Sequence, residues 1–361
     1  MSNIRFRMML VMSLFVLLSS FSSVFAQDSV DIVVLLPDSA SSARWEADDR
    51  RFLAEAFEEA GVSYSIVNAE GDRQTQITQA EQAITNGAKV LLMVNLDSGS
   101  GAAIIDLARD AGVSVIDYDR LTIEGSGADY YVSFNNAAVG RLQGEGLVLA
   151  VDEAVAAGEI EGTPQIAVLN GSPTDNNATL FREGYFSVIQ SKFDSGEWEL
   201  VAEQSVPDWD NQQALVIFEQ MQTDNPEIDA AVAANDGLAQ AVITARQNAG
   251  LPAIPVTGQD ATVGGIQNVL AGNQSMTVYK AIRAEARAAA GLAIAILTNN
   301  TPAIELMVGG NSTNNGTTDV PSILLTPVSV TDANVIETVI ADGFRTLEEV
   351  CVGEFADVCP E

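Results

Sequence analysis

The stretch Asp31-Ile-Val-Val-Leu-Leu-Pro37 is a short, continuously apolar run, and a helical pattern from 44 to 60 follows it. The same alternation continues with apolar runs at 65–68, 90–95, 113–118 and 130–134, which Ala-rich helical sequence separates. Strands that alternate with helices predict parallel βαβ units. Because the runs are apolar throughout, we expect helices on both faces of the sheet.

A second series of the same kind begins at Gln165-Ile-Ala-Val-Leu-Asn170 and continues at 200–206, 228–234 and 254–258. The run Met276-Thr-Val-Tyr279, an Ala-rich helix and an apolar run at 323–330 come after it, so we expect the chain to cross between two lobes. The predicted fold class is α/β, with two doubly wound parallel-sheet lobes joined by a multi-strand hinge. The expected division is 29–136 with 278–325 for the amino-terminal lobe, and 137–277 with 326–361 for the carboxy-terminal lobe.

The first residues predict a secretory signal peptide over 1–26. Arg5 and Arg7 precede an apolar run from Met8 to Leu18, and the small-residue pattern of a cleavage site ends at Ala26. A membrane anchor is the alternative, but a spanning helix needs roughly 20 apolar residues and this run is shorter. We therefore expect a periplasmic or extracellular protein.

The charge balance limits the partners that the protein can have. The chain has 49 acidic residues against 17 Lys and Arg, and it has no histidine. Nucleic acid and anionic membranes are therefore not expected partners, and a well-solvated surface or a saline habitat would explain the acidity. Without histidine the usual general base and the commonest metal ligand are missing. We expect a monomer with no cofactor and no metal.

The two cysteines, Cys351 and Cys359, lie close together near the end of the chain. In an exported protein this pair predicts a disulfide that closes a short C-terminal loop, and two free thiols are the alternative.

Polar residues recur where the predicted strands end. Asp119 and Arg120 follow one strand, Asn235 follows another, and Asp260 follows a third. Ligands of open parallel sheets bind beyond the carboxyl ends of the strands. Carboxylates beside arginine suit the adjacent hydroxyls of a sugar, because each group can bind two hydroxyls. Helix N-capping is the alternative for each residue taken singly.

Aromatic and basic residues complete this candidate sugar site. Trp45 and Trp209 each lie after a predicted strand and offer a flat face to the C–H groups of a sugar, although a tryptophan is more often part of a core. Trp198 precedes a strand and is expected to pack at the periphery. Lys280 ends another apolar run, where it is either a solvated lysine or a hydrogen-bond donor to the ligand.

Six motifs together resemble the periplasmic xylose-binding proteins of ABC sugar importers, within the ribose- and galactose-binding group. The resemblance runs from about Asp31 to Phe344, and the motifs are Arg44-Trp45, Tyr118-Asp-Arg120, Gly171-Ser-Pro-Thr-Asp-Asn-Asn-Ala178, Ala234-Asn-Asp236, Thr257-Gly-Gln-Asp260 and Met276-Thr-Val-Tyr-Lys280. The chain departs from the family pattern at 37–43, at Ser205 and in the added cysteine pair, and the first departure bears on which sugar fits.

This resemblance implies a type I periplasmic binding protein fold that captures a monosaccharide, a pentose such as D-xylose, and delivers it to an ABC transporter permease. It implies that the sugar contacts are Arg44, Asp119, Arg120, Asn177, Trp209, Asn235, Asp260 and Lys280, with Trp45 and Asp175 nearby. A sugar sensor that feeds a chemoreceptor or a sensor kinase would use the same cleft.

Two other classes of protein are weighed against this interpretation. Asp119 and Asp260 could in principle form the carboxylate pair of a glycoside hydrolase, but the chain has no histidine, metal cluster or Gly-rich phosphate loop. A sugar-responsive transcription regulator needs a basic helix-turn-helix, and the predicted signal peptide occupies that place. We expect a protein that is not an enzyme.

Overall fold

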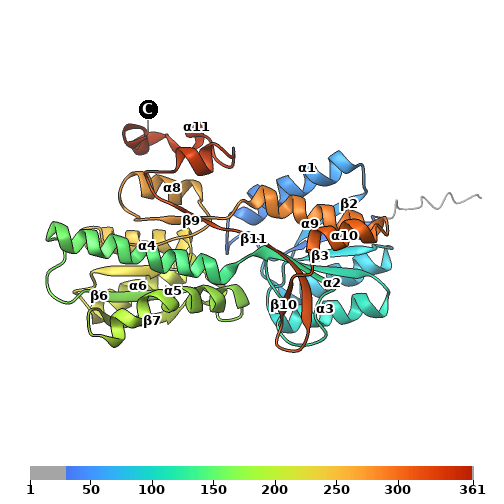
Figure 1. The fold of residues 1–361 in the computed structure, drawn as a ribbon, viewed down its shortest axis with the longest axis horizontal. Helices are drawn as coiled ribbons and strands as arrows, with labels where there is room; N and C mark the ends of the chain where they lie inside the picture. The colour runs from blue at the N-terminus through green and yellow to red at the C-terminus, as the bar shows by residue number, and fades with distance from the viewer. Residues whose placement is uncertain (1–29, 360–361) are drawn as a thin grey trace, which may run out of the picture.

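The computed structural model describes residues 30–359 and shows two α/β lobes side by side (Figure 1). The predicted fold class is confirmed. The predicted signal peptide at 1–26 lies outside the described residues. Among the helices of residues 30–359, none combines the length and the apolar character that a membrane span requires.

The amino-terminal lobe is built on a seven-stranded sheet in the order β10-β11-β5-β4-β3-β1-β2. All neighbouring strands are parallel except β10 and β11, which pair antiparallel. The strands are β1 (Ile32–Leu36), β2 (Tyr64–Asn68), β3 (Val90–Met93), β4 (Ser114–Tyr118), β5 (Tyr130–Phe134), β10 (Ser312–Asn314) and β11 (Asp319–Leu325).

Helices cover both faces of this sheet, as the apolar strands predict. Alternate residues of β1 point to opposite faces, so that Val34 packs with one set of helices and Leu35 with the other. The first set is α1 (Arg50–Ala60) and α9 (Ile282–Leu297), and the second is α2 (Arg73–Thr85) and α3 (Ser98–Asp110). The short helix α10 (Thr301–Val308) packs beside α9.

The carboxy-terminal lobe has the parallel sheet β7-β6-β8, and Val256 adds a parallel bridge to Ala231 of β8. Its strands are β6 (Gln165–Asn170), β7 (Glu199–Ser205) and β8 (Ala230–Ala233), and its helices are α4 (Asn136–Ala157), α5 (Asn176–Asp194), α6 (Asn211–Asp224), α7 (Asp236–Asn248) and α8 (Val263–Leu270). Helices α4 and α5 approach so closely that a Cβ on Gly140 would lie 2.0 Å from the Phe181 carbonyl oxygen. Only glycine fits there.

The chain passes between the lobes three times, between β5 and α4, after β9 (Thr277–Tyr279), and between β11 and β12 (Val328–Val330). β9 and β12 pair antiparallel, and both contact α4 of the carboxy-terminal lobe. The expected lobe boundaries at 136/137, 277/278 and 325/326 stay predictions.

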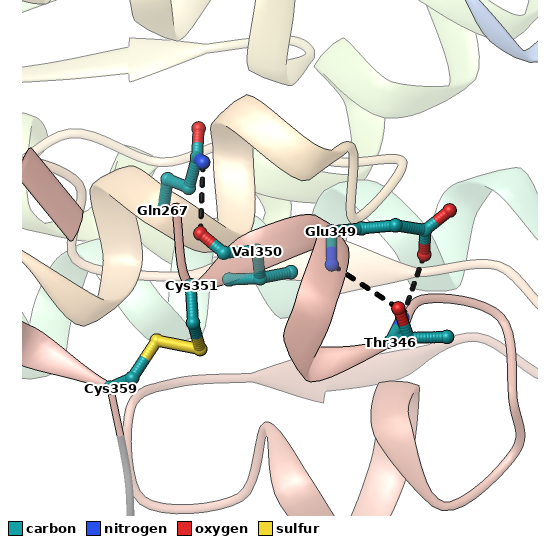
Figure 2. The surroundings of a disulfide bond; sticks show 6 residues. All are labelled: Gln267, Thr346, Glu349, Val350, Cys351 and Cys359. Atoms are coloured by element: carbon teal, nitrogen blue, oxygen red, sulfur yellow. Dashed lines mark hydrogen bonds between the residues drawn. A yellow bond between two sulfur atoms is a disulfide. The ribbon is translucent and has the colours of Figure 1, made fainter. Parts of the chain in front are cut away.

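The C-terminal tail folds over α8 (Figure 1). It contains the π-helix η3 (Ile336–Ile340), α11 (Leu347–Val350) and the 3-10 helix η4 (Gly353–Val358). Thr346 caps α11 in a reciprocal pair with Glu349, and the Gln267 side chain of α8 donates to the Val350 carbonyl at 2.9 Å. Figure 2 shows the disulfide between Cys351 and Cys359 beside these contacts.

We expect this disulfide to stabilise the C-terminal tail against local unfolding. Replacing both Cys351 and Cys359 by Ser should lower the free energy of opening the tail by at most about 2.5 kcal/mol, the loop-entropy value for so short a loop. Hydrogen–deuterium exchange should then accelerate in 335–350 and stay unchanged in α5, which serves as the control. Unchanged exchange in the tail would show that the bond contributes nothing there.

A buried carboxylate holds the turn that follows β4. Asp117 accepts hydrogen bonds from the Thr122 backbone nitrogen at 2.6 Å and from the Thr122 hydroxyl at 2.9 Å, which closes the loop carrying Asp119 and Arg120. Burial raises the pKa of Asp117 to about 7, although the bonds from Thr122 act against this shift. Between about pH 4 and pH 7, Asp117 therefore keeps its proton in the native state. In the unfolded chain, where an aspartate has a pKa of about 4, the proton is already released.

The pKa of Asp117 predicts the direction of a pH effect on stability. The free energy of unfolding should fall as the pH rises from about 4 to about 7, by up to about 1.4 kcal/mol per pH unit for this group. Asp117→Asn should flatten this slope in urea titrations, whereas Asp110→Asn, at an exposed position, should leave it as in the wild type. If the free energy of unfolding has the same pH dependence in the wild type, Asp117→Asn and Asp110→Asn, the raised pKa of Asp117 is contradicted.

Candidate functional site

The ten predicted site residues line one small cavity between the lobes. Ser41, Ser42, Phe181 and Gln259 also line it. The amino-terminal lobe contributes Arg44, Trp45, Asp119 and Arg120; the carboxy-terminal lobe contributes Asp175, Asn177, Trp209, Asn235 and Asp260; Lys280 follows β9. Residues that are far apart in the sequence thus meet where the strands of both sheets end.

Three of these residues have an unusual backbone. The φ angles of Asp119, Trp209 and Asp260 are 63°, 56° and 97°, which is the left-handed region that disfavours residues other than glycine. Strained backbone of this kind clusters at binding sites, where the surrounding structure holds it in place. The turn after each strand thereby aims its side chain into the cavity.

Arg44 is the centre of a buried ionic network. Its guanidinium donates to Asp119 Oδ2 at 2.7 Å, to both oxygens of Asp49 at 2.7 and 2.8 Å, and to Glu285 Oε2 at 2.6 Å. Burial would raise the pKa of Asp119, but Arg44, Lys280 and Arg120 outweigh it and lower that pKa. Asp119 is therefore held as a carboxylate that can accept hydrogen bonds.

Lys280 provides a second buried cation. Its Nζ lies 3.2 Å from Asp260 Oδ1 and 3.8 Å from Asp119 Oδ2, and the residue is only 3% exposed. Burial acts to lower the pKa of Lys280, but Asp260 and Asp119 outweigh this and raise it. The solvated-lysine alternative is wrong, because the ammonium is enclosed between carboxylates of both lobes.

A third group joins Arg120 to Trp209 through Asp175. Asp175 Oδ2 lies 3.0 Å from Arg120 Nε and accepts a hydrogen bond from Trp209 Nε1 at 3.0 Å. Its other oxygen accepts from the Asn177 backbone at 2.9 Å and so caps α5. Asp175 therefore both caps α5 and lines the cavity.

The same combination occurs at Asn235, whose Oδ1 caps α7 by accepting from the Leu238 nitrogen at 2.9 Å. Asp119 and Asp260 cap no helix of residues 30–359. For these two carboxylates the capping alternative is wrong.

Asn177 ties the two lobes together. Its Nδ2 donates to the carbonyl oxygen of Asp119 at 3.1 Å and to Oδ1 of Asp119 at 3.0 Å, while Asn136 Nδ2 donates to Asn177 Oδ1 at 2.8 Å. The two bonds to Asp119 join the lobes and exist only while the lobes are close, so the structure is a closed arrangement.

The tryptophans have different surroundings. The Arg44 guanidinium lies over the Trp45 ring at 4.5 Å, and the Trp45 Nε1 donates to the Ser41 hydroxyl at 3.1 Å. Trp209 packs edge-on against Phe181, with ring centroids 6.3 Å apart. Trp198 packs on Phe193 and is buried in the carboxy-terminal core, so the expectation of peripheral packing is wrong.

The cavity contains residues that were not among the ten predicted site residues. Gln259 Oε1 is buried and has no hydrogen-bond partner within residues 30–359, so it is an acceptor available to a polar ligand. Its place between Gly258 and Asp260, inside a quoted motif, was a usable signal. Phe181 lies one helical turn after Asn177, and that spacing could also have pointed to the cavity.

Comparisons with known proteins agree with this geometry. A family model described as a periplasmic binding protein domain matches residues 32–301. The D-xylose-binding periplasmic protein of Escherichia coli is 37% identical over 309 residues, which cover 85% of this chain and 88% of that protein. A multiple sugar-binding periplasmic protein of Azospirillum brasilense is 32% identical over 93% of this chain and 96% of its own length.

Solved structures show the same architecture. The solute-binding protein of a carbohydrate transporter from Chloroflexus aurantiacus, in complex with D-glucose, aligns with a TM-score of 0.78 and 29% identity over 89% of this chain and 98% of that one. The resemblance drawn from the six motifs is confirmed. The chain belongs to the periplasmic binding protein family and has its type I fold.

Proposed function

We propose that this chain binds a monosaccharide between its lobes and delivers it to an ABC importer, and that the sugar is D-xylose. One observation carries the proposal: two buried carboxylates, Asp119 and Asp260, flank Lys280 at a cavity that both lobes line. The similarity to D-xylose-binding proteins of Escherichia coli and Haemophilus influenzae supports the choice of sugar.

The groups around the cavity suit the hydroxyls of a sugar. Asp119 and Asp260 would accept hydrogen bonds, while Arg120, Lys280 and Asn235 would donate them. Because these groups are buried, bonds to the charged ones are stronger than bonds between neutral partners. The rings of Trp45 and Trp209 are the aromatic faces on which the C–H side of the sugar would pack.

Binding and closure are coupled in this proposal. A ligand shifts the balance between open and closed forms only by its differential affinity for them. A sugar that contacts Asp119 from one lobe and Asp260 from the other has most of its contacts in the closed form. The importer would recognise this closed form. We propose that the protein acts as a monomer in the periplasm or outside the cell. The predicted signal peptide and the periplasmic relatives support this location.

We propose further that the protein is not an enzyme. A glycoside hydrolase needs one carboxyl group with a raised pKa as its general acid. Asp119 does not fit this role, since its pKa is lowered because Arg44, Lys280 and Arg120 outweigh the effect of burial. Incubation with aryl xylosides and free pentoses should therefore give no turnover, and product formation above a protein-free blank would refute this.

The sugar itself can be identified by thermal shift. We expect D-xylose to raise the melting temperature of the mature protein, since a ligand at 100 times its Kd stabilises by about 2.7 kcal/mol. A monosaccharide panel with glucose, ribose, arabinose and galactose provides the comparison. A larger shift with another sugar would reject xylose, and no shift with any sugar would reject the proposed function.

Asp119→Asn and Asp260→Asn test the two carboxylates. Each change keeps the size of the side chain but leaves buried donors without their charged acceptor, which should weaken sugar binding by about 3 kcal/mol, or more than 100-fold in Kd, measured by calorimetry. Asp224→Asn is the matched control, because this aspartate is exposed at the end of α6 and does not line the cavity. Unchanged affinity in both site variants would reject the site.

A further inference from the structure

The turn 342–345 of the C-terminal tail contacts three segments that carry residues of the ionic network. Arg345 binds Asp48 and Ala261, and the hydroxyl of Tyr279 donates to Asp342 Oδ2. Each residue that the turn contacts is the chain neighbour of a network residue, namely Asp49, Asp260 and Lys280. The turn itself does not line the cavity.

Arg345 makes the contacts that reach both lobes. Its Nη1 and Nη2 donate to the two carboxylate oxygens of Asp48 at 2.9 and 2.8 Å, and its Nε donates to the Ala261 carbonyl oxygen at 3.3 Å. The guanidinium also lies over the Phe344 ring at 3.8 Å. The side chains of Arg345 and Asp48 are 11% and 2% exposed, so this bidentate pair is largely shielded from solvent.

The two partners of Arg345 belong to different lobes. Asp48 is in the π-helix η1 (Trp45–Asp49), which leads into α1 of the amino-terminal lobe. Ala261 follows the segment around Val256, which pairs with β8 of the carboxy-terminal lobe. If opening of the lobes moves Asp48 away from Ala261, Arg345 loses one of these two contacts.

The contact to Ala261 supports a strained turn. Asp260 and Ala261 have consecutive φ angles of 97° and 47°, and such a pair needs support from the surrounding structure. Ala261 is fully buried among apolar residues that include Phe344 and Ile266. Arg345 thus holds the backbone that aims Asp260 at Lys280.

We propose that Arg345 is a positioning residue that fastens the two lobes in the closed form from outside the cavity. The inference rests on the proposed sugar binding, because a contact made only in the closed form raises the affinity for any ligand that selects that form. Arg345 touches no ligand in this account. Its effect passes through Asp48 and Ala261.

Calorimetry with D-xylose, or with the best sugar of the panel, tests this role. Arg345→Gln should raise Kd about tenfold, and Asp48→Asn should do the same. The double variant should bind the sugar no more weakly than either single variant, because both changes break the same interaction, that between Arg345 and Asp48. Arg51→Gln is the matched control: Arg51 also pairs with Asp48, at 3.5 Å, but it is 47% exposed and lies in the same lobe as its partner.

The outcomes separate this inference from the proposed function. A Kd for Arg345→Gln equal to that of Arg51→Gln overturns the inference, as does a fall in melting temperature without a change in Kd, which is the sign of a purely structural role. If Arg345→Gln does not fold, Arg345→Lys replaces it, since one ammonium cannot reproduce the fork that spans both lobes.

If the wild type binds no sugar, the proposed function fails and X-ray scattering decides the inference alone. A larger radius of gyration for ligand-free Arg345→Gln than for Arg51→Gln then supports the fastening role, and equal radii overturn it.

Discussion

The structure depends on mutual compensation of buried charges between its two lobes. Arg44, Arg120 and Lys280 are almost fully enclosed, and each would be costly to bury without a carboxylate beside it. Asp119 serves both Arg44 and Lys280, while Asp260 reaches Lys280 from the other lobe. Arg44 has its three carboxylates within the amino-terminal lobe, whereas the pairs Arg120–Asp175 and Lys280–Asp260 form only when the lobes meet.

Two carboxylates that do not line the cavity, Asp49 and Glu285, orient Arg44. Asp49 and Glu285 bind the Arg44 guanidinium on the side away from the cavity. Burial raises the pKa of both carboxyl groups, because the opposing effect of Arg44 is smaller than the effect of burial. They fix the direction of the Arg44 guanidinium by taking its remaining donors. The cavity therefore presents pre-oriented groups, and preorganisation lowers the cost of ordering them when a ligand binds.

Much of the fold and of the candidate site was predictable from the sequence. Apolar runs such as 32–36 are buried on both faces, so their pattern predicts covered parallel strands, and polar residues after such strands meet at one edge. Asp49, Glu285 and Arg345 were not predictable in this way. They lie on helices or in the tail, where a charged residue looks like any solvated one until the tertiary contacts are known. The strand β10, within the Asn-, Thr- and Gly-rich stretch 309–319, was not predictable either, because its polar residues complete the edge of the sheet through backbone bonds that composition does not reveal.

The position of β11 has a consequence for the order in which the protein can form. This strand, 319–325, lies directly beside β5, 130–134, although almost the whole carboxy-terminal lobe is encoded between them. The ribosome synthesises residue 134 long before residue 325. The sheet of the amino-terminal lobe therefore lacks β11 beside β5 until synthesis is nearly finished. Pairings between such distant segments form late and slowly. The amino-terminal lobe can therefore complete its sheet only after the segments of the carboxy-terminal lobe between β5 and β11 have been synthesised.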